Sequence, residues 1–163
     1  MITSEEDWER RVRRLWEASG SLDGPAFRAA MKDLVALRPP DDPAALFELA
    51  SALDATACDS EAAHLYRRAL AAGLAGVRRR RAVLQLAGTL RRLGRAEESV
   101  GLLRAERALV SDDLDDALVA FLALSLTEAG QEREAVSLLL KTLSPHLPRY
   151  TEAIARSADE LPL

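Results

Sequence analysis

The residue types that could carry out catalysis or bind a metal are few in this sequence and are poorly spaced for either. Its only histidines, His64 and His146, lie far apart, and Cys58 is its only cysteine. The stretch EAAH, which ends at His64, lacks a second histidine one helical turn away and so is not a zinc motif. No glycine-rich phosphate loop and no Gly-x-Ser-x-Gly motif is present. The sequence therefore predicts a protein that is not an enzyme, with no metal site and no cofactor.

A run of four arginines, in the stretch VRRRRAVL at residues 77–84, precedes an apolar helical pattern. Successive helix residues are rotated by about 100°, so the four arginines cannot share one face. Positive charge at a helix N-terminus also opposes the helix dipole, which destabilises the helix by about 0.3–1 kcal/mol per exposed side chain. Two explanations are open at this point. Arg78 and Arg79 neutralise the C-terminal end of a preceding helix, or Arg81 and two later arginines offer cations to an acidic partner.

The composition favours helices and argues against a general affinity for nucleic acid. Of the 163 residues 48% are hydrophobic but only 4% are aromatic, and alanine and leucine supply most of the apolar content. A net charge of −4 does not indicate a nucleic-acid-binding surface. The single cysteine suits a reducing compartment, and the charged N-terminus lacks the apolar core of a signal peptide. We therefore expect a cytoplasmic protein.

Three segments of the chain repeat one another at offsets of 37 and 36 residues. They contain LFELASALDATACDSEAAHLYRRAL, VLQLAGTLRRLGRAEESVGLLRAER and VAFLALSLTEAGQEREAVSLLLKTL. Each has a leucine followed by alanine, a second leucine one helical turn later, a turn, and a second helix with a small and a large residue. The turn falls at Ala57, Gly94 and Gly130. Each helix pair is too small to bury its own apolar face, so stacked neighbours must share a core.

This pattern resembles the tetratricopeptide repeat family, over roughly residues 43–148. The sequence departs from the family pattern because Leu46, Val83 and Val119 replace its leading tryptophan, and leucine replaces the aromatic residue of the first helix. The resemblance implies an all-α fold, a right-handed α-solenoid of antiparallel helix pairs. We expect about nine helices and no strands.

The expected organisation has three parts. Residues 1–40 form a divergent N-terminal helical hairpin without the repeat signature. Residues 41–148 hold three repeats, at about 43–76, 77–111 and 112–148. Residues 149–163 supply a helix that caps the exposed end of the core.

The resemblance also implies a binding site, because the first helix of each repeat lines a concave groove in this family. Carried over position by position, the groove residues are Phe47, Ser51, Asp54, Arg81, Leu84, Gln85, Gly88, Arg91, Arg92, Leu124, Thr127 and Glu128.

These observations favour a non-catalytic scaffold that binds a peptide or protein segment, which the arginines predict to be acidic. The first alternative is a self-associating, homodimeric module, since a basic middle section stands beside an acidic later one. The second alternative is RNA binding by a helical repeat. The acidic total and a groove whose one aromatic residue is Phe47 count against it.

Overall fold

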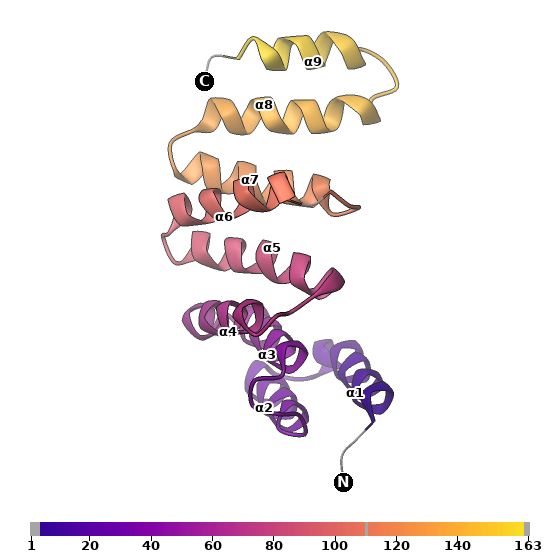
Figure 1. Ribbon diagram of the computed structural model, residues 1–163. Coiled ribbons are helices and arrows are strands. Elements are labelled where there is room, and N and C mark those ends of the chain that lie inside the picture. The colour runs from indigo at the N-terminus through magenta and orange to yellow at the C-terminus, as the bar shows by residue number, and fades with distance from the viewer. Residues whose placement is uncertain (1–3, 110, 162–163) are drawn as a thin grey trace. The chain divides into compact units, whose positions relative to one another are not determined.

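The structure is a computed structural model, and it describes residues 4–109 and 111–161. Within these residues the chain forms nine α-helices, two short 3₁₀ helices and no strand (Figure 1). The chain divides into two compact units, Met1–Thr89 and Leu90–Leu163, and the boundary falls inside α5. From α1 to α4 in the first unit, and from α6 to α9 in the second, each helix packs on the one before it. This confirms the all-helical, α-solenoid fold expected from the repeats.

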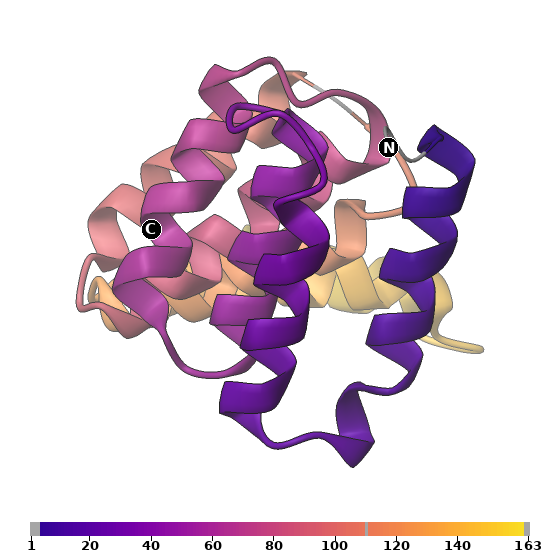
Figure 2. The same cartoon turned by 90° about the horizontal axis from the view of Figure 1, so that it is seen from below.

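The first unit contains four whole helices and the start of a fifth. These are α1 (Glu5–Glu17), α2 (Gly24–Val35), α3 (Pro43–Ala55), α4 (Asp59–Ala71) and α5 (Gly76–Arg92), with a 3₁₀ turn at Ser19–Ser21. Side-chain caps begin the first three: Ser4, Asp23 and Asp42 each accept a hydrogen bond from a backbone N–H of the first turn. Helices α1, α2 and α3 pack in sequence, as Figures 1 and 2 show in indigo and purple.

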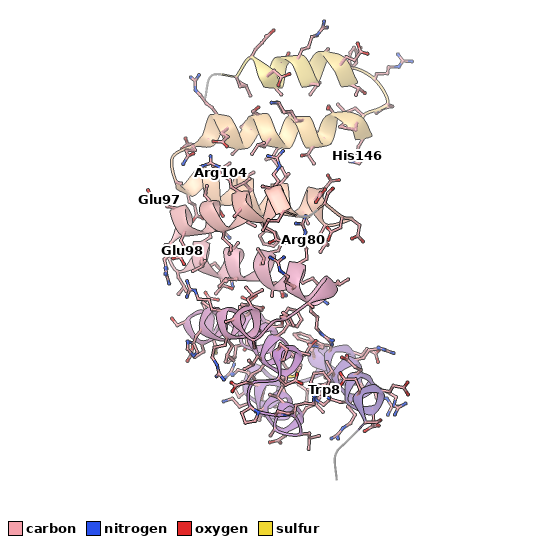
Figure 3. The ribbon with its side chains drawn as sticks, viewed as in Figure 1. Trp8, Arg80, Glu97, Glu98, Arg104 and His146 are labelled. Atoms are coloured by element: carbon pink, nitrogen blue, oxygen red, sulfur yellow. The ribbon has the colours of Figure 1, made fainter. Side chains whose placement is uncertain are left out.

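The core of the N-terminal hairpin is built around Trp8, which is labelled in Figure 3. Its side chain is fully buried. Its indole Nε1 donates to the carbonyl oxygen of Leu34 at 3.0 Å, and the ring packs with Val12, Leu34 and Ala45. Because Ala45 belongs to α3, this cluster joins the hairpin to the first repeat. The hairpin therefore shares its core with the repeat that follows it.

The second unit continues from α5 with α6 (Ala96–Leu109), α7 (Asp115–Glu128), α8 (Glu132–Leu143), a 3₁₀ turn at Ser144–His146, and α9 (Thr151–Asp159). Helix α6 packs on α7, α7 on α8, and α8 on α9. Two buried hydroxyls face each other where α6 meets α7, with Ser99 Oγ 2.8 Å from Ser125 Oγ. Helix α9 is held by Ser137, whose hydroxyl donates to the carbonyl oxygen of Ala158 at 2.8 Å.

The turns between paired helices share one geometry. Ala57, Gly94 and Gly130 all have left-handed backbone conformations, with φ of 59°, 74° and 75°. In each turn the next residue donates its N–H to a carbonyl five positions earlier: Cys58 to Leu53, Arg95 to Leu90, and Gln131 to Leu126, at 2.8–2.9 Å. This is the Schellman arrangement that satisfies the last carbonyls of a helix. The three turns recur at the offsets of the sequence repeat.

No helix within the described ranges is long and apolar enough to cross a lipid bilayer. Helix α5 begins at Gly76, the last residue of the segment expected for the first repeat. The proposed division into hairpin, repeats and cap stays a prediction.

Candidate interaction surface

The residues predicted to line a groove come from three helices and fall in both units. In the first unit α3 carries Phe47, Ser51 and Asp54, and α5 carries Arg81, Leu84, Gln85 and Gly88. In the second unit the end of α5 carries Arg91 and Arg92, and α7 carries Leu124, Thr127 and Glu128.

Several of the first-unit residues lie below the surface. Phe47 is 0% exposed, Ser51 4% and Leu84 5%, and Gly88 is buried as well. Arg81 is exposed, whereas Asp54 and Gln85 are half-buried. Direct contact with a ligand would therefore fall to Arg81, with smaller contributions from Asp54 and Gln85. The four buried residues would support the surface from beneath.

A polar network connects α3, α4 and α5 beneath this surface. The Ser51 hydroxyl donates to Gln85 Oε1 at 3.4 Å. The Tyr66 hydroxyl lies 3.4 Å from Ser51 Oγ and 3.3 Å from Asp54 Oδ2, and Thr89 Oγ1 lies 3.2 Å from Asp54 Oδ1. Burial of the phenol raises the pKa of Tyr66 well above its ordinary value. The network fixes Asp54 and Gln85 in position.

Tyr66 and Thr89 were not predicted to belong to this surface. In the repeat pattern Tyr66 is the large core residue of a second helix, and its ring is indeed fully buried. Its hydroxyl nevertheless reaches the first-helix side through Asp54. A buried tyrosine needs a partner for its hydroxyl, which is the one sequence signal that could have suggested this contact.

Arg81 is held in place by an aromatic ring. Its guanidinium carbon lies 5.5 Å from the centroid of the Phe47 ring, within the range of a cation–π interaction. Such a contact retains the positive charge at the surface and restricts the side chain. Arg81 therefore presents a positioned cation.

In the second unit Arg91 already has a carboxylate partner. Its Nη1 donates to Glu128 Oε1 at 2.5 Å, and its Nε is buried without a hydrogen bond among the described residues. Arg92 is exposed, and Leu124 is 51% exposed. Thr127 is also exposed, but its hydroxyl donates to the carbonyl oxygen of Ala123 within the same helix. The charge of Arg91 is therefore largely balanced inside the protein.

Arg78, the first of the four consecutive arginines, binds two carboxylates of its own chain. Its Nη1 and Nη2 each donate to the Glu9 carboxylate of α1 at 2.7 Å, and its Nε donates to Glu48 of α3 at 2.9 Å. Glu48 is 5% exposed and also accepts a 2.8 Å hydrogen bond from the Trp16 indole. Arg78 thus joins α5 to the N-terminal hairpin, a role that neither explanation from the sequence foresaw. Arg80, two residues on and labelled in Figure 3, is 2% exposed, whereas the Arg78 side chain is 28% exposed.

The model of the tetratricopeptide repeat family matches residues 43–161, which is more than half of the chain. The chain belongs to the tetratricopeptide repeat family. The resemblance seen in the sequence is thereby confirmed, and the match extends through α9. Neither the curated proteins nor the solved structures contain a match.

Tetratricopeptide repeat proteins typically act as non-enzymatic scaffolds in protein–protein interactions. In this member Arg81 is a positioned cation on α5 of the first unit, and Leu124 is exposed on α7 of the second unit. Within the described residues no group of three or more His, Cys, Asp or Glu side chains could hold a metal ion.

Proposed function

We propose that this tetratricopeptide repeat protein is a non-catalytic scaffold that binds a segment of a partner protein along the first helices of its repeats. The observation that carries the proposal is Arg81, an exposed cation whose guanidinium rests on the buried Phe47 ring. An oriented cation above a rigid support loses little freedom on binding, which favours recognition of a carboxylate. The expected ligand is a segment with acidic side chains. A cytoplasmic location stays a prediction.

The test compares two charge-reversed variants with the wild type. Arg81→Glu/Arg92→Glu changes the predicted surface, and Arg11→Glu/Arg14→Glu makes the same change in net charge on α1. Ribonuclease-treated native lysate is passed over each immobilised chain, and the captured proteins are identified by mass spectrometry. We expect a discrete set of proteins to be lost from the first variant alone, while its circular dichroism spectrum matches the wild type.

Other outcomes contradict the proposal. Equal capture by both folded variants would show that Arg81 and Arg92 are not part of the binding surface. If the wild type captures only its own chain, and light scattering gives the mass of a dimer, the function is self-association and not the binding of a partner protein. Untreated lysate is passed over the wild type in parallel, and material captured from it but not from the ribonuclease-treated lysate would point to RNA.

A further inference from the structure

An open groove lies in the first unit, between the second helix of the N-terminal hairpin and the second helix of the first repeat. Helix α2 forms one wall, α4 the other, and α3 and the turn after it form the floor. The groove has a volume of about 650 Å³. Its lining residues are Arg28, Lys32, Leu49, Leu53, Cys58, Ser60, Glu61, His64 and Leu65. None of them belongs to the first-helix surface proposed above.

The two walls carry basic side chains without partners. Arg28 and Lys32 are one helical turn apart on α2, and His64 faces the same groove from α4. Within the part of the chain that the structure describes, none of the three makes an ion pair or a side-chain hydrogen bond. The one carboxylate in the lining is that of Glu61. Two permanent cations therefore stand over the groove against a single anion.

The floor is apolar. Leu53 is 7% exposed, and Leu49 and Leu65 are half-buried, so leucine side chains form the base of the groove. A ligand that fits must place apolar side chains on this floor and negative charge at the α2 wall. An amphipathic segment with leucine-like and acidic residues has both features. The groove is open to solvent, whereas sites for small molecules bury most of the ligand surface.

We propose that the groove between α2 and α4 is a second docking site, which takes an acidic amphipathic segment of a partner protein. The carboxylates of the segment pair with Arg28 and Lys32, and its apolar side chains contact Leu49, Leu53 and Leu65. Nucleic acid fits less well, because the lining offers leucines where a base would need an aromatic platform. This site goes beyond the first-helix surface and shares no residue with it.

Cys58 allows the groove to be tested directly in the full-length chain. It is the only cysteine of the sequence and lies in the groove lining, half-buried. The rate at which a thiol reagent modifies Cys58 therefore reports occupancy of this groove alone. The probes are two synthetic helix-forming peptides with leucines at positions i, i+3 and i+7. The remaining positions are glutamate-rich in one peptide and lysine-rich in the other.

We expect the glutamate peptide to slow modification of Cys58 in a saturable manner and the lysine peptide to have no such effect. Arg28→Glu/Lys32→Glu should weaken the apparent affinity about tenfold, since two attractive contacts become repulsive. The matched control, Arg11→Glu/Arg14→Glu, should bind as the wild type does. In Arg81→Glu/Arg92→Glu the glutamate peptide should protect Cys58 as it does in the wild type. A failure of the groove proposal can therefore be told apart from a failure of the proposed first-helix surface.

Three results would overturn the proposal. Equal protection by both peptides would mean that charge does not select the ligand, and an absence of protection would mean that the groove does not bind such segments. If Cys58 becomes protected as the protein concentration rises, with no peptide added, the groove binds a second copy of this chain. If Arg28→Glu/Lys32→Glu does not fold, Arg28→Gln/Lys32→Gln replaces it, and unchanged affinity in that variant is equally decisive.

Discussion

The guanidinium of Arg78 binds the carboxylate of Glu9 through two hydrogen bonds of 2.7 Å, although the residues are 69 positions apart in the sequence. The bidentate contact attaches the start of α5 to α1. Its third hydrogen bond, from Nε to Glu48, places the same cation beside a carboxylate that is 5% exposed. The arginine run therefore begins with a residue that holds the first unit together.

Replacing Arg78 should destabilise the first unit. Glu48 accepts hydrogen bonds from Arg78 and from the Trp16 indole, and Arg78→Ala removes the first of these while Glu48 stays buried. Breaking a fully buried ion pair costs about 3–5 kcal/mol, and the 28% exposure of the Arg78 side chain should reduce this to about 2–3 kcal/mol. Urea denaturation followed by circular dichroism measures the loss. Arg11→Ala, on the exposed face of α1, is the control, and equal stability of the two variants would contradict the role of Arg78.

Stability should depend on pH through Glu9. The hydrogen bonds from Arg78 lower the pKa of Glu9 from its ordinary 4.5, against an opposing effect of burial. A carboxyl whose pKa is lower in the folded state stabilises that state above its unfolded pKa, and the contribution is lost as the pH falls through the folded pKa. The gap in unfolding free energy between wild type and Glu9→Gln should thus be constant above about pH 5 and shrink below it.

Urea titrations between neutral pH and pH 3 would measure that gap. Glu6→Gln controls for the loss of one negative charge, because Glu6 is an exposed carboxylate of the same helix. At neutral pH the gap should lie between about 1 kcal/mol, the value for an exposed ion pair, and about 3 kcal/mol, the value for breaking a buried one. A gap of the same size at pH 3 and pH 7 would show that ionised Glu9 does not stabilise the fold.

The repeated helices could be predicted because their signal is local. Leucine–alanine pairs at helical spacing, followed by a turn, specify each pair of helices without knowledge of their neighbours. The partners of Arg78 could not be predicted in this way. Glu9 and Glu48 look like ordinary exposed glutamates in the pattern, and contacts over 69 and 30 positions depend on how the hairpin packs on α3.

The candidate surface was predictable only in outline. Helical spacing correctly puts Arg81 and Gln85 on one side of α5, but it does not say how closely α3 approaches that side. In the structure the Arg81 guanidinium lies over Phe47, and Gln85 reaches Ser51. That approach buries Phe47 and Ser51, which the resemblance to the family had placed on an open groove.

The alanines of the leucine–alanine pairs should tolerate no larger side chain. Ala87 is 0% exposed, and the matching Ala50 and Ala123 are 0% and 2% exposed. Ala87→Leu should therefore overpack the core and lower the unfolding free energy by about 1–3 kcal/mol. Ala105→Leu, at an exposed position of α6, should change it by about 0.5 kcal/mol or less. Equal melting temperatures for the two variants would argue against the repeat register.

The shared turn gives two substitutions with opposite expected effects. Ala57 has φ of 59°, a left-handed conformation that costs an alanine about 1–2 kcal/mol, whereas glycine adopts it freely. Ala57→Gly should therefore stabilise the chain by up to about 1 kcal/mol, after the greater entropy loss of glycine on folding. Gly94→Ala should destabilise it by about 1–2 kcal/mol.

The comparison is clean because a Cβ added at Gly94 would meet no atom within 4 Å, so the backbone alone determines the cost. Ala105→Gly, inside α6, controls for the general effect of glycine and should cost about 1 kcal/mol. The three unfolding free energies come from urea denaturation under one buffer condition. A destabilised Ala57→Gly, equal to the Ala105→Gly control, would mean that the turn after α3 does not hold its alanine in a strained conformation. The equivalence of the three repeat turns would then fail at the first repeat.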